Sequence, residues 1–265
     1  MENKTDTQPD VLSIWKAVVE LGVKNESGAL CTIVASHGST PRHTGSKMLV
    51  YSDRRILGSV GGGQMEDQVI REALAAMQDG KPRLLKYNLS DPAEGDPGVC
   101  GGQLEVFVEP IVPKPAVIVV GAGHVGKAVA HLAKWLGFRV AISDDRAELC
   151  SPESVPEADE FFAGPLADLP NHLRIDSNTY FILATRSVDI DVPGLPALLD
   201  TPAAYIGVIG SRRRWETTRK QLLEAGIDED RINRVRSPMG LEIAAETPEE
   251  IAVSIMAEII KLRRA

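Results

Sequence analysis

Residues 117–144 read V-I-V-V-G-A-G-H-V-G-K-A-V-A-H-L-A-K-W-L-G-F-R-V-A-I-S-D, and this stretch decides the fold of the second half of the chain. An apolar run typical of a buried parallel strand leads into a Gly-x-Gly-x-x-Gly turn, a helix and a second apolar run. Gly121 allows the tight turn, Gly123 lets the backbone approach a pyrophosphate, and Gly126 lets the helix pack closely on the strand. The sequence therefore predicts a dinucleotide-type strand-turn-helix-strand unit.

The same unit contains candidate ligand-binding groups. The helix that begins near His124 offers backbone amides to an anion, and Asp144 ends the second strand, where an acid can accept hydrogen bonds from a ribose. Asp145 and Arg146 leave NAD and NADP both open, because an arginine here can accommodate a 2′-phosphate. Two simpler alternatives stand beside these roles. The glycines can serve helix-sheet packing alone, and His124 can be an ordinary polar residue at a helix start.

The remainder of this half alternates strand and helix, as a parallel sheet with crossover helices requires. The expected strands are residues 117–120, 139–143, 179–184 and 204–209, with a weaker one near 160–163. Thr247 and Glu250 form a capping box around Pro248, so a last helix begins there. Its stripe of Ile251, Ile255, Ile259 and Leu262 is most simply core packing, with a dimer face as the alternative.

The first half has a different rhythm, in which short apolar runs alternate with glycine-rich turns. The expected strands are residues 30–35, 47–51, 56–60, 83–87 and 104–108, and the expected helices are 11–21 and 65–78, the second ending at Gly80. Pro110, Pro113 and Pro115 should separate the strand at 104–108 from the one at 117–120. The predicted fold is α/β: an N-terminal α+β domain, residues 1–112, followed by a Rossmann-like parallel-sheet domain, residues 113–265.

Composition limits the classes of function. The chain has 265 residues, 43% of them hydrophobic and 25% charged, which is typical of a globular protein. A net charge of −8 does not indicate the positively charged surface that nucleic-acid binding requires. No apolar run is long enough to span a bilayer. The polar N-terminus lacks the apolar core of a signal peptide, so we expect a cytoplasmic protein. Cys31, Cys100 and Cys150 are too few and too far apart for a disulfide framework or a Cys-x-x-Cys metal site.

Ser211, Arg212, Arg213 and Arg214 form a second candidate anion site. They follow the strand at 204–209, with Ser211 as the natural N-cap of a helix. Cations oppose the positive end of a helix dipole, so arginines in the first turn call for an external anion or for solvent. Arginine offers bidentate hydrogen bonds to phosphate or carboxylate. The preceding Gly207 and Gly210 open the backbone, which favours binding over a solvated basic face.

The N-terminal half has bare loops of its own. Gly61, Gly62 and Gly63 precede a helix and should leave amides free for a ligand, whereas each such loop alone is more often a simple turn. With the loops at residues 37–42 and 100–102, they predict a shared ligand surface, whose polar contacts would be Ser39, Arg42 and Gln64. Cys100, between glycines, is a candidate accessible thiol, although a buried inert cysteine is the commoner case.

Asp189 and Asp191 follow the strand at 179–184 and so lie at the carboxyl edge of the sheet. They can bind a metal or act as acid and base, and the alternative is a plain turn with solvated carboxylates. The sequence has no His-x-Glu zinc signature, Gly-x-Ser-x-Gly or Walker motif, which argues against zinc hydrolases, serine hydrolases and nucleotide kinases.

Several motifs, in order along nearly the whole chain, resemble the xanthine dehydrogenase accessory protein family, XdhC/CoxI. They are G-S-T-P-R, G-S-V-G-G-G-Q-M-E, V-C-G-G-Q-L-E-V-F-V-E-P, V-G-A-G-H-V-G, Y-I-G-V-I-G-S-R-R-R and S-P-M-G-L-E-I-A-A-E-T-P-E-E-I-A-V-S-I. The resemblance implies a two-domain chain that assembles as a homodimer. It also implies a cofactor-delivery chaperone that carries the molybdenum cofactor (molybdopterin), supports its sulfuration with a cysteine desulfurase, and delivers it to an apo molybdenum hydroxylase.

This chain departs from the family pattern at two places. Many relatives have a cysteine where this chain has Gln64, and a Gly-His pair where it has Ser187 and Val188. These replacements put in doubt any sulfur or metal chemistry at those positions. Cys100 and Asp191 remain as candidate catalytic residues.

Three hypotheses follow. The first is a maturation factor that binds the molybdenum cofactor through glycine-loop amides and Arg212 to Arg214 and passes it to a hydroxylase. The second is a NAD(P)-dependent oxidoreductase, which the glycine turn with Asp144 favours. The third is a protein-protein adaptor with a vestigial nucleotide fold, which the missing cysteine and histidine favour.

Overall fold

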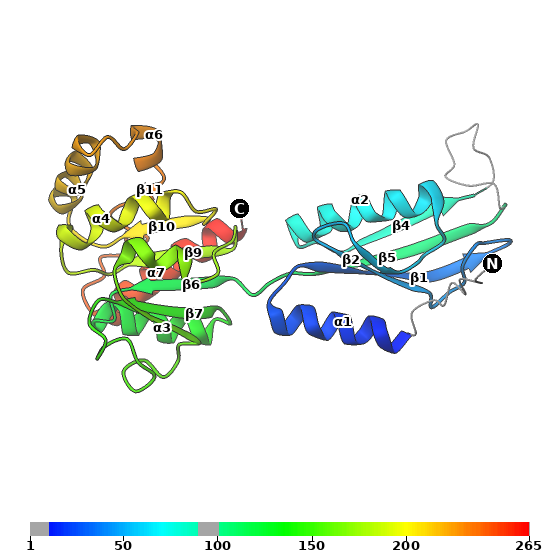
Figure 1. Ribbon diagram of the computed structural model, residues 1–265, viewed down its shortest axis with the longest axis horizontal. Helices are drawn as coiled ribbons and strands as arrows, with labels where there is room; N and C mark the ends of the chain where they lie inside the picture. The colour runs from blue at the N-terminus through cyan, green and yellow to red at the C-terminus, as the bar shows by residue number, and fades with distance from the viewer. Residues whose placement is uncertain (1–10, 90–100, 265) are drawn as a thin grey trace, which may run out of the picture. The chain divides into compact units, whose positions relative to one another are not determined.

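The computed structural model of the protein describes residues 11–89 and 101–264. The chain divides into two compact units, Met1–Pro113 and Lys114–Ala265, called unit 1 and unit 2 below (Figure 1). Within the described ranges, no helix is long and apolar enough to cross a membrane.

Unit 1 is a five-stranded antiparallel sheet in the order β3-β2-β1-β5-β4. Its elements are α1 (Val11–Lys24), β1 (Gly28–His37), β2 (Lys47–Tyr51), β3 (Ile56–Gly58), α2 (Gly63–Asp79), β4 (Arg83–Asn88) and β5 (Gln103–Ile111). The helices lie on opposite faces of the sheet (Figure 1), because alternate residues along β1 face different helices. Ala29 and Cys31 belong to the core under α2, whereas Leu30 belongs to the smaller core under α1.

One strand boundary differs from the prediction. β5 continues through Pro110 to Ile111, although the sequence suggested that this proline would end the ladder. β4 pairs with β5 only as far as Val108, so beyond that residue β5 has a neighbour on one side alone. Pro110 has no backbone N–H, and it is tolerated because no strand that the structure describes pairs with β5 on its β4 side at this residue.

Unit 2 is a six-stranded parallel sheet in the order β11-β10-β9-β6-β7-β8. Its strands are β6 (Ala116–Val120), β7 (Arg139–Asp144), β8 (Glu160–Ala163), β9 (Thr179–Leu183), β10 (Tyr205–Val208) and β11 (Val235–Arg236). Its helices are α3 (His124–Trp135), the 3-10 helix η2 (Leu166–Asn171), α4 (Val188–Leu199), α5 (Arg212–Glu224), α6 (Glu229–Ile232) and α7 (Pro248–Arg264). This is the Rossmann order, which confirms the predicted fold class.

Both faces of this sheet are covered, which explains its continuous apolar strands. Val117 and Val119 of β6 pack in the core with α3 and α7, whereas Ile118 and Val120 pack in the core with η2 and α4. Figure 1 shows α3 and α4 on opposite sides of the sheet. Gly126 is needed at the start of α3, because a Cβ there would lie 1.9 Å from the carbonyl oxygen of Gly121.

The predicted capping box of α7 is confirmed. The backbone N–H of Glu250 donates to Thr247 Oγ1 (3.2 Å), and the backbone N–H of Thr247 donates to Glu250 Oε2 (3.1 Å). Ile255 and Ile259 are buried in the core beside α3, so the apolar stripe of this helix is core packing at these two positions.

Candidate functional site

A pocket of about 580 Å³ opens in unit 2 at the carboxyl ends of β6, β7, β8 and β9. This is where the strand order reverses, the usual ligand site of such sheets. Its lining residues come from five segments: Val120, Gly121 and Gly123; Ser143, Asp144, Asp145 and Arg146; Gly164, Pro165, Leu166 and Ala167; Ala184, Thr185 and Arg186; Asp189, Ile190, Pro193 and Gly194. The pocket therefore brings together the predicted glycine turn, Asp144 and the loop after β9.

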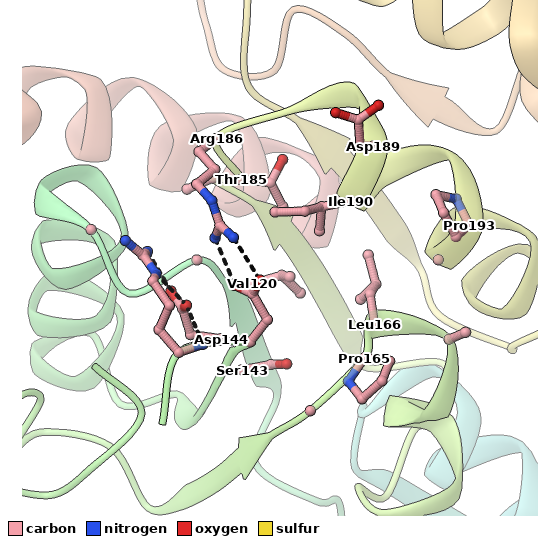
Figure 2. A pocket seen from close by; sticks show the side chains of 18 residues that line it. Val120, Ser143, Asp144, Pro165, Leu166, Thr185, Arg186, Asp189, Ile190 and Pro193 are labelled. Atoms are coloured by element: carbon pink, nitrogen blue, oxygen red, sulfur yellow. Dashed lines mark hydrogen bonds and ion pairs between the residues drawn. The ribbon is translucent and has the colours of Figure 1, made fainter. Parts of the chain in front are cut away.

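The two sides of the pocket differ in chemistry. Leu166, Ile190 and Pro193 form an apolar side contributed by η2 and α4 (Figure 2). The other side carries two carboxylate-guanidinium pairs, Asp144 with Arg146 and Asp145 with Arg186. Asp144 and Arg186 are labelled in Figure 2. A flat ring system with an anionic substituent suits such a combination of surfaces.

Asp144 is buried, and its carboxylate is fully engaged within the protein. The backbone N–H of Ala122, inside the glycine turn, donates to Oδ2 (2.8 Å). Arg146 donates from its backbone N–H (3.0 Å) and Nε (2.9 Å) to Oδ1, and from Nη2 (2.9 Å) to Oδ2. Burial alone would raise the pKa of Asp144, but these hydrogen bonds outweigh it and hold the pKa below its usual range.

This arrangement bears on the predicted ribose contact. A carboxylate has about four acceptor positions, and four donors already point at Asp144. The Ala122 amide is likewise committed to Asp144 instead of to a pyrophosphate. A ribose hydroxyl can reach Asp144 only after Arg146 moves away.

Asp145 and Arg186 form the second pair, at the rim of the pocket. Nη1 and Nη2 of Arg186 donate to Oδ1 and Oδ2 of Asp145, both at 2.6 Å. The hydrogen bonds from Arg186 lower the pKa of Asp145 to about 2. Both side chains are partly solvent-exposed, so the pair itself adds little stability and Arg186 can exchange partners. Arg186 was not among the predicted site residues; its position directly after a buried parallel strand was the available signal.

Asp191 lies beneath this rim, and the alternative of a solvated carboxylate is wrong for it. Asp191 is fully buried in the first turn of α4, where it accepts from Thr185 Oγ1 (2.5 Å) and Arg214 Nη2 (2.6 Å). Arg214 also donates to the carbonyl oxygen (2.9 Å) and Oγ1 (2.7 Å) of Thr185. The three side chains brace α4, α5 and the loop after β9. Asp189 is exposed at the pocket, and the described part of the chain contains no group of three His, Cys, Asp or Glu side chains that could hold a metal ion.

The other predicted arginines point elsewhere. Ser211 is the N-cap of α5, with its Oγ accepting from the backbone N–H of Arg214 at 3.3 Å. Arg212 and Arg213 are exposed, do not line the pocket, and form no ion pair with any residue that the structure describes. His124 is the first residue of α3 and is exposed, also outside the pocket lining.

The structure brings the glycine loops of unit 1 together. A Cβ on Gly102 would lie 2.3 Å from the carbonyl oxygen of Ser39, and a Cβ on Gly61 would lie 2.8 Å from Pro41 Cγ. Arg42 belongs to the same loop as Ser39 and Pro41. Cys100, the candidate thiol, lies outside the described residues.

The amides of the triple-glycine loop are only partly free. The carboxylate of Glu66 accepts from Ser59 Oγ (2.6 Å) and from the backbone N–H groups of Val60 (3.0 Å) and Gly62 (3.2 Å). Gly63 and Gln64 begin α2 and are exposed beyond this cap. An anionic ligand at this loop would therefore have to compete with the Glu66 carboxylate for these backbone N–H groups. In both units, a carboxylate of the chain itself accepts a hydrogen bond from a backbone N–H of a glycine turn: Glu66 in unit 1 and Asp144 in unit 2.

Comparison with known proteins identifies relatives of both units. The family model of the XdhC Rossmann domain matches residues 117–259, and that of the XdhC and CoxI family matches residues 23–88. The protein YqeB of Escherichia coli (strain K12), described as uncharacterized, is 36% identical over 254 residues, which is 95% of this chain and 46% of YqeB. A probable xanthine dehydrogenase subunit of Bacillus subtilis (strain 168) is 33% identical over 159 residues, 60% of this chain and 46% of that protein. The chain thus spans about half the length of these two relatives.

Two further matches cover most of this chain and most of the matched protein. The molybdenum cofactor insertion chaperone PaoD of Escherichia coli (strain K12) is 24% identical over 283 residues, covering 96% of this chain and 89% of PaoD. A crystal structure described as a xanthine dehydrogenase from Bacillus halodurans has a TM-score of 0.51 and 24% identity, covering 94% of this chain and 95% of that one. The structural match supports the fold alone.

Proposed function

Because the chain belongs to the XdhC and CoxI family, we propose that it binds the molybdenum cofactor and passes it to a molybdenum hydroxylase of the xanthine or carbon monoxide dehydrogenase type. The name of the relative PaoD, an insertion chaperone for this cofactor, supports the choice of cargo. In this proposal the cofactor is carried and released, so no turnover chemistry is required. A cysteine desulfurase and a second copy of the chain are further proposed partners.

The pocket of unit 2 is the observation that carries the proposal. Its volume of about 580 Å³ is in the range of small-molecule and cofactor sites. Molybdopterin combines a flat pterin with a phosphate, and the pocket combines an apolar side with arginines. The pterin would lie against Leu166, Ile190 and Pro193, and the phosphate would lie at the opposite rim.

Arg186 is the residue that we propose for the phosphate. A phosphate can replace the Asp145 carboxylate on the guanidinium, because both are bidentate acceptors and the existing pair is partly solvated. The N-terminus of α3 begins beside the pocket at Gly123 and adds a favourable dipole for an anion. Exchange of one acceptor for another also allows release, as a delivery protein needs.

A retention experiment tests this assignment. Purified protein is incubated with excess cofactor and passed through gel filtration, and the pterin that co-elutes is measured by fluorescence after oxidation. Loss of a bidentate, charge-assisted contact costs about 1.5–3 kcal/mol, so Arg186→Ala should weaken retention about 10- to 100-fold. The matched control is Arg219→Ala, which breaks an exposed ion pair with Glu229 away from the pocket. Equal retention by Arg186→Ala and wild type would remove Arg186 from the site, and no retention by wild type would end the binding proposal.

A NAD(P)-dependent oxidoreductase is the second candidate, favoured by the Rossmann strand order with Asp144 at the end of β7. The four donors on Asp144 weigh against it. Fluorescence titration with NADH and NADPH separates the two proposals. We expect no binding by wild type at millimolar cofactor; saturable binding by wild type would favour the oxidoreductase.

A further inference from the structure

A second, smaller pocket of unit 2 lies at the amino ends of β10 and β11, and it is called the amino-edge pocket below. Its volume is about 240 Å³, and its lining includes Ala204, Asn233, Arg234, Arg236 and Leu262. The pocket proposed for the cofactor opens at the carboxyl ends of the strands and is lined by other residues. The two pockets are therefore separate sites on one sheet.

The amino-edge pocket carries two positive charges. Arg234 and Arg236 both line it, and none of its described lining residues is acidic. This concentration of positive charge stands out in a chain whose net charge is −8. Two guanidinium groups in one small cavity repel each other unless an anion lies between them. The pocket therefore has the electrostatic character of an anion site.

Acids of the neighbouring segments already have partners. Asp200, which follows α4, pairs with Arg231. Glu258 of α7 accepts from Tyr205 Oη (2.5 Å) and from the backbone N–H of Gly240 (2.8 Å). Neither acid lines the amino-edge pocket. Neutralisation of the two pocket arginines by these acids would require existing interactions to break.

Arg234 is held in place by main-chain oxygens. Its Nη1 donates to the carbonyl oxygen of Leu199 (2.6 Å), and its Nη2 donates to those of Thr201 (3.2 Å) and Ala203 (3.3 Å). These acceptors carry no formal charge, so the positive charge of Arg234 is not neutralised. A guanidinium has five N–H donors and three are used, so two remain for a ligand.

Arg236 faces the same pocket from β11 and has no partner of its own. Val235 packs in the core with η2 and α4, so Arg236, the next residue of the strand, points to the opposite face, the one that α7 covers. Leu262 of α7 lines the pocket there. Arg236 is exposed, and neither its guanidinium nor the side-chain amide of Asn233 forms a hydrogen bond or ion pair with any residue that the structure describes.

We propose that the amino-edge pocket binds the phosphate group of a small molecule. A phosphate monoester carries a charge of about −1.5 to −2 near pH 7 and so matches two guanidinium groups, whereas one carboxylate would match a single group. Arg234 and Arg236 can each donate two parallel hydrogen bonds to its oxygens. Asn233 adds amide donors, and Leu262 offers an apolar surface to an organic substituent. The volume lies below the roughly 300–1,000 Å³ of drug-sized sites, which indicates a small ligand.

This inference does not rest on the proposed function, and the test removes the other pocket from the measurement. Arg186→Ala protein is titrated with inorganic phosphate by calorimetry at fixed ionic strength. We expect saturable binding with a Kd below about 1 mM. Adding Arg236→Ala should weaken binding at least ten-fold through the loss of a charge-assisted contact, and it should leave Tm unchanged because the side chain is exposed. Adding Arg213→Ala instead, the matched control outside both pockets, should leave the phosphate Kd unchanged.

A second variant supplies the acid that the pocket lacks. Asn233→Asp, in the Arg186→Ala background, changes the charge with almost no change in volume, and its carboxylate should pair with the arginines and weaken phosphate binding at least ten-fold. Phenyl phosphate distinguishes two sources of the anion. Tighter binding than inorganic phosphate would indicate an organic phosphate that uses Leu262, and equal binding would indicate the free ion; both support the site.

Four results would overturn the proposal. They are no saturable phosphate binding by Arg186→Ala protein, a Kd that Arg236→Ala and Asn233→Asp both leave unchanged, a loss of binding in the Arg213→Ala control, and equal competition by acetate. The third result would place the anion at the start of α5. The fourth would mean that the site does not prefer a doubly charged phosphate to a carboxylate.

Discussion

Replacing Asp191 by alanine should destabilise unit 2, because this carboxylate is a buried partner of Arg214. Asp191 is fully buried and accepts one hydrogen bond from Arg214 and one from Thr185. Its removal leaves a guanidinium whose side chain is only 21% exposed and whose Nε already has no hydrogen-bond partner among the described residues. The uncompensated charge, more than the lost bonds, determines the cost.

The magnitude follows from the remaining contacts. Breaking a buried ion pair typically costs about 3–5 kcal/mol. Arg214 keeps its two hydrogen bonds to Thr185 and some access to water, so we expect the lower end, about 3 kcal/mol. For a domain of this size that corresponds to a decrease in the Tm of unit 2 of about 6–12 °C.

Calorimetry or urea unfolding measures this change, with Asp189→Ala as the control. Asp189 is exposed two residues earlier on the same helix, and its replacement should change the free energy of unfolding by less than about 0.5 kcal/mol. The double variant Asp191→Leu/Arg214→Met removes both charges and should recover most of the lost stability. A stable Asp191→Ala protein that no longer transfers cofactor would refute the structural role and would favour a direct part for Asp191 in cofactor binding or release.

Three further predictions concern single positions. Gly126→Ala should cost more than about 4 kcal/mol, because its Cβ would lie 1.9 Å from a carbonyl oxygen, whereas Gly123→Ala meets no atom within 4 Å; chemical denaturation compares the two. The pKa of Asp145 is lowered to about 2 by Arg186, so the small stability gained from this pair is present above about pH 4 and is lost as the pH falls toward 2; urea unfolding of wild type and Arg186→Ala should converge in that range. Burial raises the pKa of Cys31 to about 12, so a thiol reagent at about pH 8 should label it only after unfolding, as peptide mapping can show.

The fold was predictable because its strongest signals are local. The glycine turn, the apolar strands and the capping box of α7 each specify one element, and together they predicted a Rossmann-like parallel sheet, whose strand order the structure then supplies. The motif resemblance to the XdhC/CoxI family is likewise confirmed by the family matches. β11 was missed because two residues carry no periodicity, and Pro110 was misjudged because its tolerance depends on where β4 ends.

The candidate site was less predictable, because the sequence does not show which donors are already satisfied. Asp144 and Glu66 each take an amide from a glycine turn that the sequence suggested was free for a ligand. The sequence also does not show which of the arginines at the start of α5 points into the protein. Only Arg214 reaches inward, and this depends on where α4 places the buried Asp191. The Ala122–Asp144 and Asp191–Arg214 hydrogen bonds join residues that are 22 and 23 positions apart in the sequence. Such pairings arise from tertiary packing, which no local sequence pattern specifies.

The most direct test of the central claim compares two ways of losing the bound cofactor. Ile190→Trp fills the apolar side of the pocket, whereas Arg212→Ala/Arg213→Ala removes the exposed arginines outside it. The measurement is the molar ratio of molybdenum cofactor retained per chain after gel filtration. We expect Ile190→Trp to abolish retention and the double arginine variant to keep it. Retention by Ile190→Trp with loss in the arginine variant would contradict binding in the pocket and would place the cofactor at the exposed arginines.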